Sequence, residues 1–78
     1  MDNKEKLLNL IRKTLKLSDE TVIPEENFFS TLQIDSLLAL ELLVSIEMEF
    51  GIQIDDQDLN VDLLTSIQGL LNYIEKKQ

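Results

Sequence analysis

The chain has 78 residues, 44% of them apolar, with a formal net charge of −8 and with neither cysteine nor histidine. A chain of this length forms one small domain, expected over residues 1–78, with room for about three or four short elements. The missing Cys and His exclude disulfides, thiolate zinc sites, a Cys nucleophile and a His general base, and with them most enzyme mechanisms.

The charge is unevenly distributed along the chain. Residues 1–17 carry a net positive charge, whereas residues 18–75 contain thirteen acids and neither Lys nor Arg. An acidic field of this extent favours basic protein partners and disfavours nucleic acid and anionic membranes. No apolar run approaches the roughly 20 residues that span a bilayer, and the N-terminus lacks a signal-peptide core. The sequence therefore predicts a cytoplasmic protein without membrane insertion.

The first expected element is a helix near residues 3–16. Asp2 and Glu5 have the spacing of a capping box, with Asp2 as the N-cap. Apolar residues then recur at helical spacing. They are Leu7, Leu8, Leu10, Ile11 and Leu15.

Residues 17–35 are predicted to form a long loop. Pro24 disfavours helix at the residue before it, and the apolar residues that follow fit no single period. We expect those apolar side chains to hold the loop across the bundle, with a short turn near 25–29. A weak strand at 28–34 is the competing prediction.

The second helix is predicted over residues 36–50 and ends at Gly51, a favourable C-terminal cap. Residues 52–55 form a short connector, and residues 56–60 are expected to make one helical turn. The last helix starts around Ser66, with Thr65 as its N-cap, and finishes at Lys76 and Lys77. The predicted fold class is all-α: a small helical bundle of three main helices plus one short helix, with a long loop after the first helix.

The second helix has apolar residues on two faces when it is projected at about 100° per residue. The expected core face consists of Ala39, Leu42, Leu43, Ile46 and Phe50. The opposite arc consists of Leu37, Leu40, Val44 and Met48, edged by Glu41 and Glu47. A small bundle has too few elements to cover both faces, so the opposite arc is predicted to be a partner surface. The alternative is that the long loop folds over it.

The tripeptide Asp35-Ser36-Leu37 stands at the head of that helix and, taken alone, is ordinary N-cap chemistry. Further motifs follow it. They are Glu41-Leu42-Leu43-Val44, Glu47-Met48-Glu49-Phe50-Gly51-Ile52, Ile54-Asp55-Asp56-Gln57-Asp58 and Tyr73-Ile74. With this set the chain resembles the acyl carrier protein family over residues 4–75, without an obvious gap.

The resemblance implies a stand-alone, non-catalytic carrier that holds 4′-phosphopantetheine, taken from coenzyme A, as a phosphodiester on Ser36. The thiol of the arm would then carry an acyl or aminoacyl thioester between enzymes of fatty-acid, polyketide or peptide biosynthesis. A serine at a helix N-terminus suits an attached phosphate. Neighbouring Asp35 could help to hold Mg²⁺ transiently in the transferase complex, and no resident metal is expected.

The same resemblance implies the partners of a monomeric carrier. They are a phosphopantetheinyl transferase and acyl- or aminoacyl-loading and biosynthetic enzymes with basic docking surfaces. The positions that match the family's partner-facing residues are Leu37, Leu40, Glu41, Val44, Glu47 and Met48. The chain departs from the family at Gln33, where glycine is common, and at Leu38 and Met48, where fatty-acid carriers often have acids. Leu38 and Met48 make the partner face more apolar than expected of a fatty-acid carrier, which favours a specialised carrier of a polyketide, peptide or modified-acyl pathway.

Three alternatives remain at this point. The alternating residues Asp56, Asp58, Asn60 and Asp62 suggest a calcium loop, but Val61 and Ile67 occupy the positions that require Gly and Glu. A helical adaptor without a prosthetic group would use the acidic field and the apolar arc but not Ser36. A D-alanyl carrier would share the arm and differ in its cargo.

Overall fold

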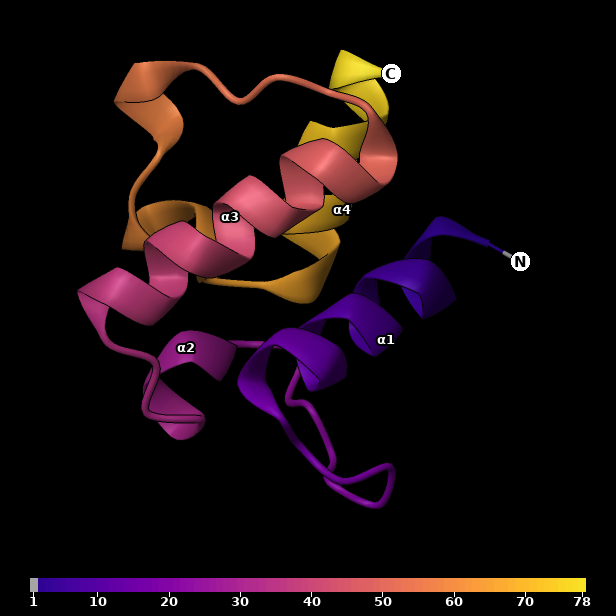
Figure 1. Cartoon of the computed structure of the whole chain (residues 1–78), viewed down its shortest axis with the longest axis vertical. Helices are drawn as coiled ribbons and strands as arrows, with labels where there is room; N and C mark the ends of the chain where they lie inside the picture. The colour runs from indigo at the N-terminus through magenta and orange to yellow at the C-terminus, as the bar shows by residue number, and fades with distance from the viewer. Residues whose placement is uncertain (1) are drawn as a thin grey trace.

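The computed structural model describes residues 2–78 as a bundle of helices joined by long connections (Figure 1). The α-helices are α1 (Asn3–Leu15), α2 (Phe28–Thr31), α3 (Ser36–Phe50) and α4 (Ile67–Lys77). Two 3₁₀ turns, η1 (Asp56–Asp58) and η2 (Val61–Leu64), lie between α3 and α4. The described part of the chain contains no strand beyond an isolated bridge between Glu26 and Ser66. The all-α prediction is confirmed.

Helix α1 follows its prediction to within one residue. The Asp2 carboxylate accepts a hydrogen bond of 2.8 Å from the Glu5 N–H, as expected of an N-cap. The helix ends at Lys16, whose left-handed backbone (φ 57°) turns the chain away. Its buried residues are Leu7, Leu10 and Ile11.

The loop after α1 contains the four-residue helix α2, so the competing prediction of a strand at 28–34 is wrong. Phe28, the first residue of α2, is completely buried, and its burial holds the loop against the bundle. Just before it, the backbone of the loop is bonded to the start of α4. The Ile67 N–H donates to the Glu25 carbonyl at 2.9 Å, and the Asn27 N–H donates to Thr65. The loop therefore spans the bundle, as its apolar residues predicted.

Helix α3 has the bounds that its capping residues predicted. Asp35 caps its N-terminus by accepting the Leu38 N–H at 2.8 Å, and Gly51 closes its C-terminus in the left-handed conformation at φ 64°. The predicted core face is buried in full: Ala39, Leu42, Leu43, Ile46 and Phe50. α1 and α4 pack on the same core, with the start of α1 beside the end of α4, where Asn3 donates to Glu75 and Gln78.

The helical turn expected at 56–60 is the 3₁₀ turn η1, and the second turn η2 was not predicted. The predicted N-cap of the last helix is wrong by one residue. Ser66, not Thr65, caps α4 and accepts the Gly69 N–H at 2.9 Å, while the Thr65 hydroxyl donates to the Asp62 carbonyl. Across residues 2–78, every helix is too short or too polar to cross a membrane.

Candidate functional site

Ser36 is the first residue of α3 and is exposed to solvent. Within residues 2–78 its hydroxyl takes part in no hydrogen bond, because Asp35 satisfies the capping position before it. The hydroxyl groups of two other serines form hydrogen bonds with nearby residues. Ser18 is bonded to Thr21 at 3.0 Å, and Ser66 caps α4. Ser36 therefore presents an exposed hydroxyl at the positive end of the dipole of a 15-residue helix.

A hollow of about 280 Å³ lies beside Ser36. It is formed where the segment that carries η1 and η2 passes the first two turns of α3. Its walls are Ser36, Ala39, Leu40, Leu59 and Asn60. A group attached to the Ser36 oxygen would have an apolar depression within immediate reach.

The second apolar face of α3 is open. Leu37 is 74% exposed, Leu40 45%, Val44 42% and Met48 81%. A shallow hollow of about 390 Å³ runs along this face. The long loop, which contains α2, lies below α3 in Figure 1 and leaves these side chains exposed, so the alternative that it covers this face is wrong.

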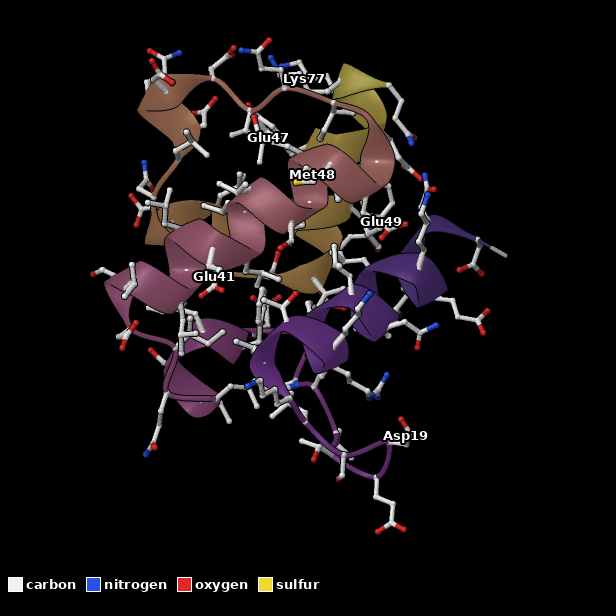
Figure 2. The ribbon with its side chains drawn as sticks, viewed as in Figure 1. Asp19, Glu41, Glu47, Met48, Glu49 and Lys77 are labelled. Carbon is white, nitrogen blue, oxygen red and sulfur yellow. The ribbon has the colours of Figure 1, made fainter. Side chains whose placement is uncertain are left out.

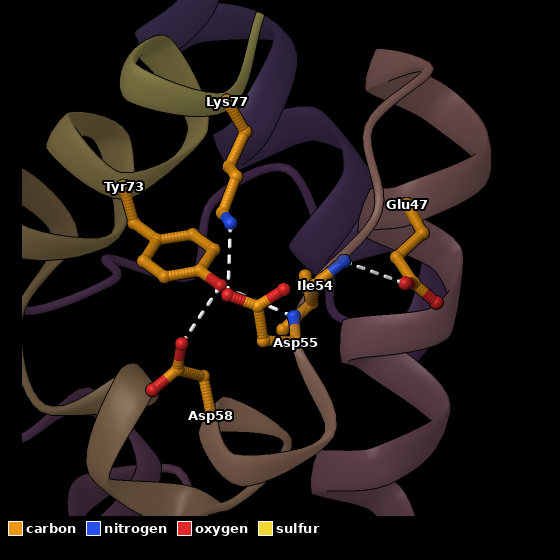
Figure 3. Close-up of polar contacts among 6 residues, drawn as sticks. All are labelled: Glu47, Ile54, Asp55, Asp58, Tyr73 and Lys77. Atoms are coloured by element: carbon orange, nitrogen blue, oxygen red, sulfur yellow. Dashed lines mark hydrogen bonds and ion pairs between the residues drawn. The ribbon is translucent and has the colours of Figure 1, made fainter.

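The predicted partner residues differ in how freely they can meet another protein. Glu41 is exposed, and Met48 stands out from α3 toward solvent (Figure 2). Glu47 is half-buried, and its carboxylate accepts the Ile54 N–H at 2.7 Å (Figure 3). Glu47 thus holds the connector against α3. Leu38, one of the positions at which this chain departs from fatty-acid carriers, is also half-buried and packs against the core. Of the two positions where fatty-acid carriers often have acids, Leu38 and Met48, only Met48 adds apolar surface to the open face.

A polar cluster that sequence reasoning missed ties η1 to α4 (Figure 3). The Tyr73 hydroxyl donates to Asp58 at 3.0 Å and accepts the Asp55 N–H at 3.3 Å. Lys77 pairs with the Asp55 carboxylate at 2.9 Å. Burial raises the pKa of Tyr73 and the bond to Asp58 adds to the rise, while the Asp55 N–H acts against it. The hydrogen bond to Asp55 raises the pKa of Lys77. The partners lie far apart in the chain, so no local pattern could reveal the cluster.

The acidic connector does not form a metal site. Within residues 2–78 no group of three or more acids is close enough to hold a metal ion. Asn60 instead caps η2 by accepting the Asp62 N–H at 2.9 Å. The arrangement of these residues in η1 and η2 gives no support to the calcium-loop alternative.

Comparison with known proteins decides the family. Residues 5–74 match the protein family described as "Phosphopantetheine attachment site". The chain is 40% identical over 78 residues to the acyl carrier protein of Nitratidesulfovibrio vulgaris strain Miyazaki F, and the match covers all of both chains. This chain belongs to the acyl carrier protein family. The acyl carrier protein of the Hildenborough strain is 36% identical over 78 residues, again over both full lengths. That of Thermosynechococcus vestitus is 34% identical over 73 residues, covering 94% of this chain and 88% of its own.

This chain is thus a non-catalytic carrier that holds acyl groups through a 4′-phosphopantetheine prosthetic group. The family implies a phosphopantetheinyl transferase and biosynthetic enzymes as its partners. The resemblance seen in the sequence is confirmed, together with the cofactor that it implied. A helical adaptor without a prosthetic group is excluded.

Proposed function

We propose that Ser36 is the residue that carries the phosphopantetheine arm, and that Asp35 is its assisting carboxylate. The observation that carries this assignment is the position of the Ser36 hydroxyl. It is exposed, makes no hydrogen bond within residues 2–78, and stands at the N-terminus of a long helix beside an apolar hollow. A phosphodiester there would lie at the positive end of the helix dipole, and its arm could extend along the hollow without displacing a core side chain.

The attachment is a phosphoryl transfer in which this chain supplies the nucleophile. The Ser36 oxygen bonds to the β-phosphorus of coenzyme A, the pyrophosphate bridge breaks, adenosine 3′,5′-bisphosphate leaves, and the hydroxyl proton passes to a base of the transferase. Asp35 is exposed next to Ser36, where it can contribute one oxygen to a Mg²⁺ held by the transferase. Once attached, the arm supplies a thiol that forms a thioester with the cargo.

The open face of α3 is the docking surface for the transferase and for the enzymes that load and use the cargo. Its apolar part consists of Leu37, Leu40, Val44 and Met48. Glu41 supplies an exposed charge for a basic residue of the partner, and Glu47 contributes mainly by holding the connector. The preference for a polyketide, peptide or modified-acyl pathway now depends on Met48 alone and stays a prediction.

Residues 1–78 act as one carrier domain that works as a monomer, because a net charge of −8 makes two copies repel each other. Since coenzyme A is the donor of the arm, loading takes place in the cytoplasm.

Intact mass spectrometry tests the attachment site. The apo protein is incubated with coenzyme A, Mg²⁺ and a broad-specificity phosphopantetheinyl transferase. The wild type should gain one phosphopantetheine and Ser36→Ala none, while Ser30→Ala, a change at another exposed serine, should be modified like the wild type. Circular dichroism should show that both variants keep their helices. Modification of Ser36→Ala would assign the arm to another residue.

A further inference from the structure

A groove between α1 and α3 extends the docking surface to a second helix. Its volume is about 480 Å³. It is lined by Leu10, Lys13 and Thr14 of α1 and by Glu41, Ser45, Met48 and Glu49 of α3. Leu10 is buried in its floor, and the exposed Met48 forms part of its α3 wall. The groove therefore offers a small apolar area, formed by Leu10 and Met48, between polar and charged walls.

The two rims of this groove carry opposite charges. Lys13 is exposed on the α1 rim, and Glu41 and Glu49 are exposed on the α3 rim, along the edge of α3 that faces α1 (Figure 2). A smaller hollow continues the groove toward the start of α1, where the Lys6 ammonium lies over the Phe50 ring at 4.8 Å from its centroid. Within residues 2–78 the single ion pair is Lys77 with Asp55, so the rims do not neutralise each other. Both remain available to a partner.

This arrangement discriminates between possible occupants. A uniformly basic surface would gain from Glu41 and Glu49 but would be repelled by Lys13. A second copy of this chain is disfavoured by the net charge of −8 on each molecule. A segment with charges of both signs gains on both rims.

We propose that the groove receives an amphipathic helix of a partner protein whose apolar residue packs on Met48 and Leu10. A Lys or Arg on one flank of that helix faces Glu41 and Glu49, and an Asp or Glu on the other flank faces Lys13. Reversing the helix would bring like charges together on both rims, so the groove sets the orientation of the partner as well as its affinity. This inference rests on the proposed function only in that Glu41 and Met48 also belong to the α3 docking surface.

Two synthetic helical peptides test the proposal on the full chain. Both have the same apolar stripe. The first has Lys along one flank and Glu along the other, and the second has Lys along both. Met48 is one of two methionines in the chain, so selective ¹³C-methyl labelling gives a simple spectrum in which its resonance reports binding. At 150 mM NaCl, screening over about 8 Å suppresses the attraction between the net charge of −8 and the more positive all-Lys peptide, so contacts at the rims decide the affinities. There the two-signed peptide should bind the wild type roughly two- to fivefold more tightly, since each exposed ion pair contributes only a little. The difference should shrink at high salt.

Reversing the charge of Lys13 should change the affinities of the two peptides in opposite directions. Lys13→Glu should weaken binding of the two-signed peptide and strengthen binding of the all-Lys peptide. The matched control is Lys4→Glu, an exposed lysine of α1 outside the groove, which should leave the ratio of the two affinities unchanged. Tighter binding of both peptides to Lys13→Glu, or no shift of the Met48 methyl with either peptide, would overturn the proposal. All measurements are repeated on Ser36→Ala, which lacks the proposed attachment site. The binding result therefore does not depend on whether Ser36 carries the arm.

Discussion

Gln33 adopts a backbone conformation that favours glycine, three residues before the proposed attachment site. Its φ of 57° is left-handed, and it ends α2 while the Ile34 N–H donates back to the Phe29 carbonyl at 2.8 Å. A side chain in this region costs about 1 kcal/mol or more. Gln33, at a position where the sequence comparison with the family led us to expect glycine, is therefore strained by the turn between α2 and α3.

Gln33→Gly should relieve that strain, offset in part by the extra freedom of glycine in the unfolded chain. We expect a gain of at most about 1 kcal/mol in the free energy of unfolding, measured by urea denaturation. Gly51→Ala is the matched comparison, because Gly51 has φ 64° and nothing lies within 4 Å of an added Cβ. That change should cost about 1 kcal/mol through backbone strain alone. A loss of stability in Gln33→Gly would contradict the account.

Tyr73 provides a direct optical test of the polar cluster at η1. It is the only tyrosine and the chain has no Trp, so the ultraviolet absorbance change on ionisation reports this hydroxyl alone. Burial and the bond to Asp58 raise the pKa of Tyr73 above its usual 10.0, so the titration midpoint should lie above that value. Asp58→Asn should lower the midpoint, and Asp62→Asn, at an exposed acid of the next turn, should not. A wild-type midpoint at or below 10.0 would mean that the cluster does not form.

The same shifts define how stability depends on alkaline pH. Tyr73 and Lys77 both hold their protons more tightly in the folded state, so the stability they contribute is fully present below about pH 10. It is lost as the pH rises through their folded pKa values. Thermal melts between pH 8 and pH 11.5 should show this loss, and Tyr73→Phe should reduce it.

At the scale of the element, α3 is informative because its two faces are both apolar and only one is buried. Leu42 and Ile46 are fully buried, so truncating either to Ala should cost roughly 2–5 kcal/mol in unfolding free energy. Val44 and Met48 are exposed, so changing either to Ser should cost much less. The Ser variants should instead slow modification of Ser36 by the transferase, because a contact surface has lost apolar area. Equal destabilisation of all four variants in thermal melts would show that the second face is covered in solution.

The boundaries of α1 and α3 were predictable because local chemistry sets them. Asp2, Asp35 and Gly51 act through their own neighbours, and each behaves as its residue type suggests. The open face of α3 was predictable for a different reason: a short chain cannot supply enough elements to bury two faces of one helix. Both inferences needed only spacing, residue type and chain length.

The remaining elements depend on contacts between distant segments. α2 is four residues long and forms because Phe28 is buried, which no local period indicates. The N-cap of α4 is Ser66 rather than Thr65 because the long loop binds the first turn of the helix. The Glu25 carbonyl accepts the Ile67 N–H, and the Glu25 carboxylate accepts the Gln68 N–H. The bond from the Ile54 N–H to Glu47, a residue predicted to face partners, was hidden for the same reason.

At the scale of the whole molecule, the excess of acids should oppose folding through long-range repulsion. Thirteen acids lie between residues 18 and 75, and the folded chain measures only 30 × 29 × 19 Å. At an ionic strength of 0.01 M the screening length is about 30 Å, so every acid interacts with most of the others. At 0.15 M it is about 8 Å, and only near neighbours still repel.

Salt should therefore raise the melting temperature of this carrier. We expect a rise of about 5 °C between 10 and 150 mM NaCl, equivalent to roughly 1 kcal/mol for a domain of this size. MgCl₂ at matched ionic strength should raise it further, since a divalent ion condenses more strongly on an acidic surface. Asp56→Asn, which removes one exposed acid, should reduce the dependence on salt, and Lys4→Gln, which removes a base, should increase it. A melting temperature that stays constant across this range, in the wild type and both variants, would show that the acids are too dispersed for their repulsion to reach the folding equilibrium.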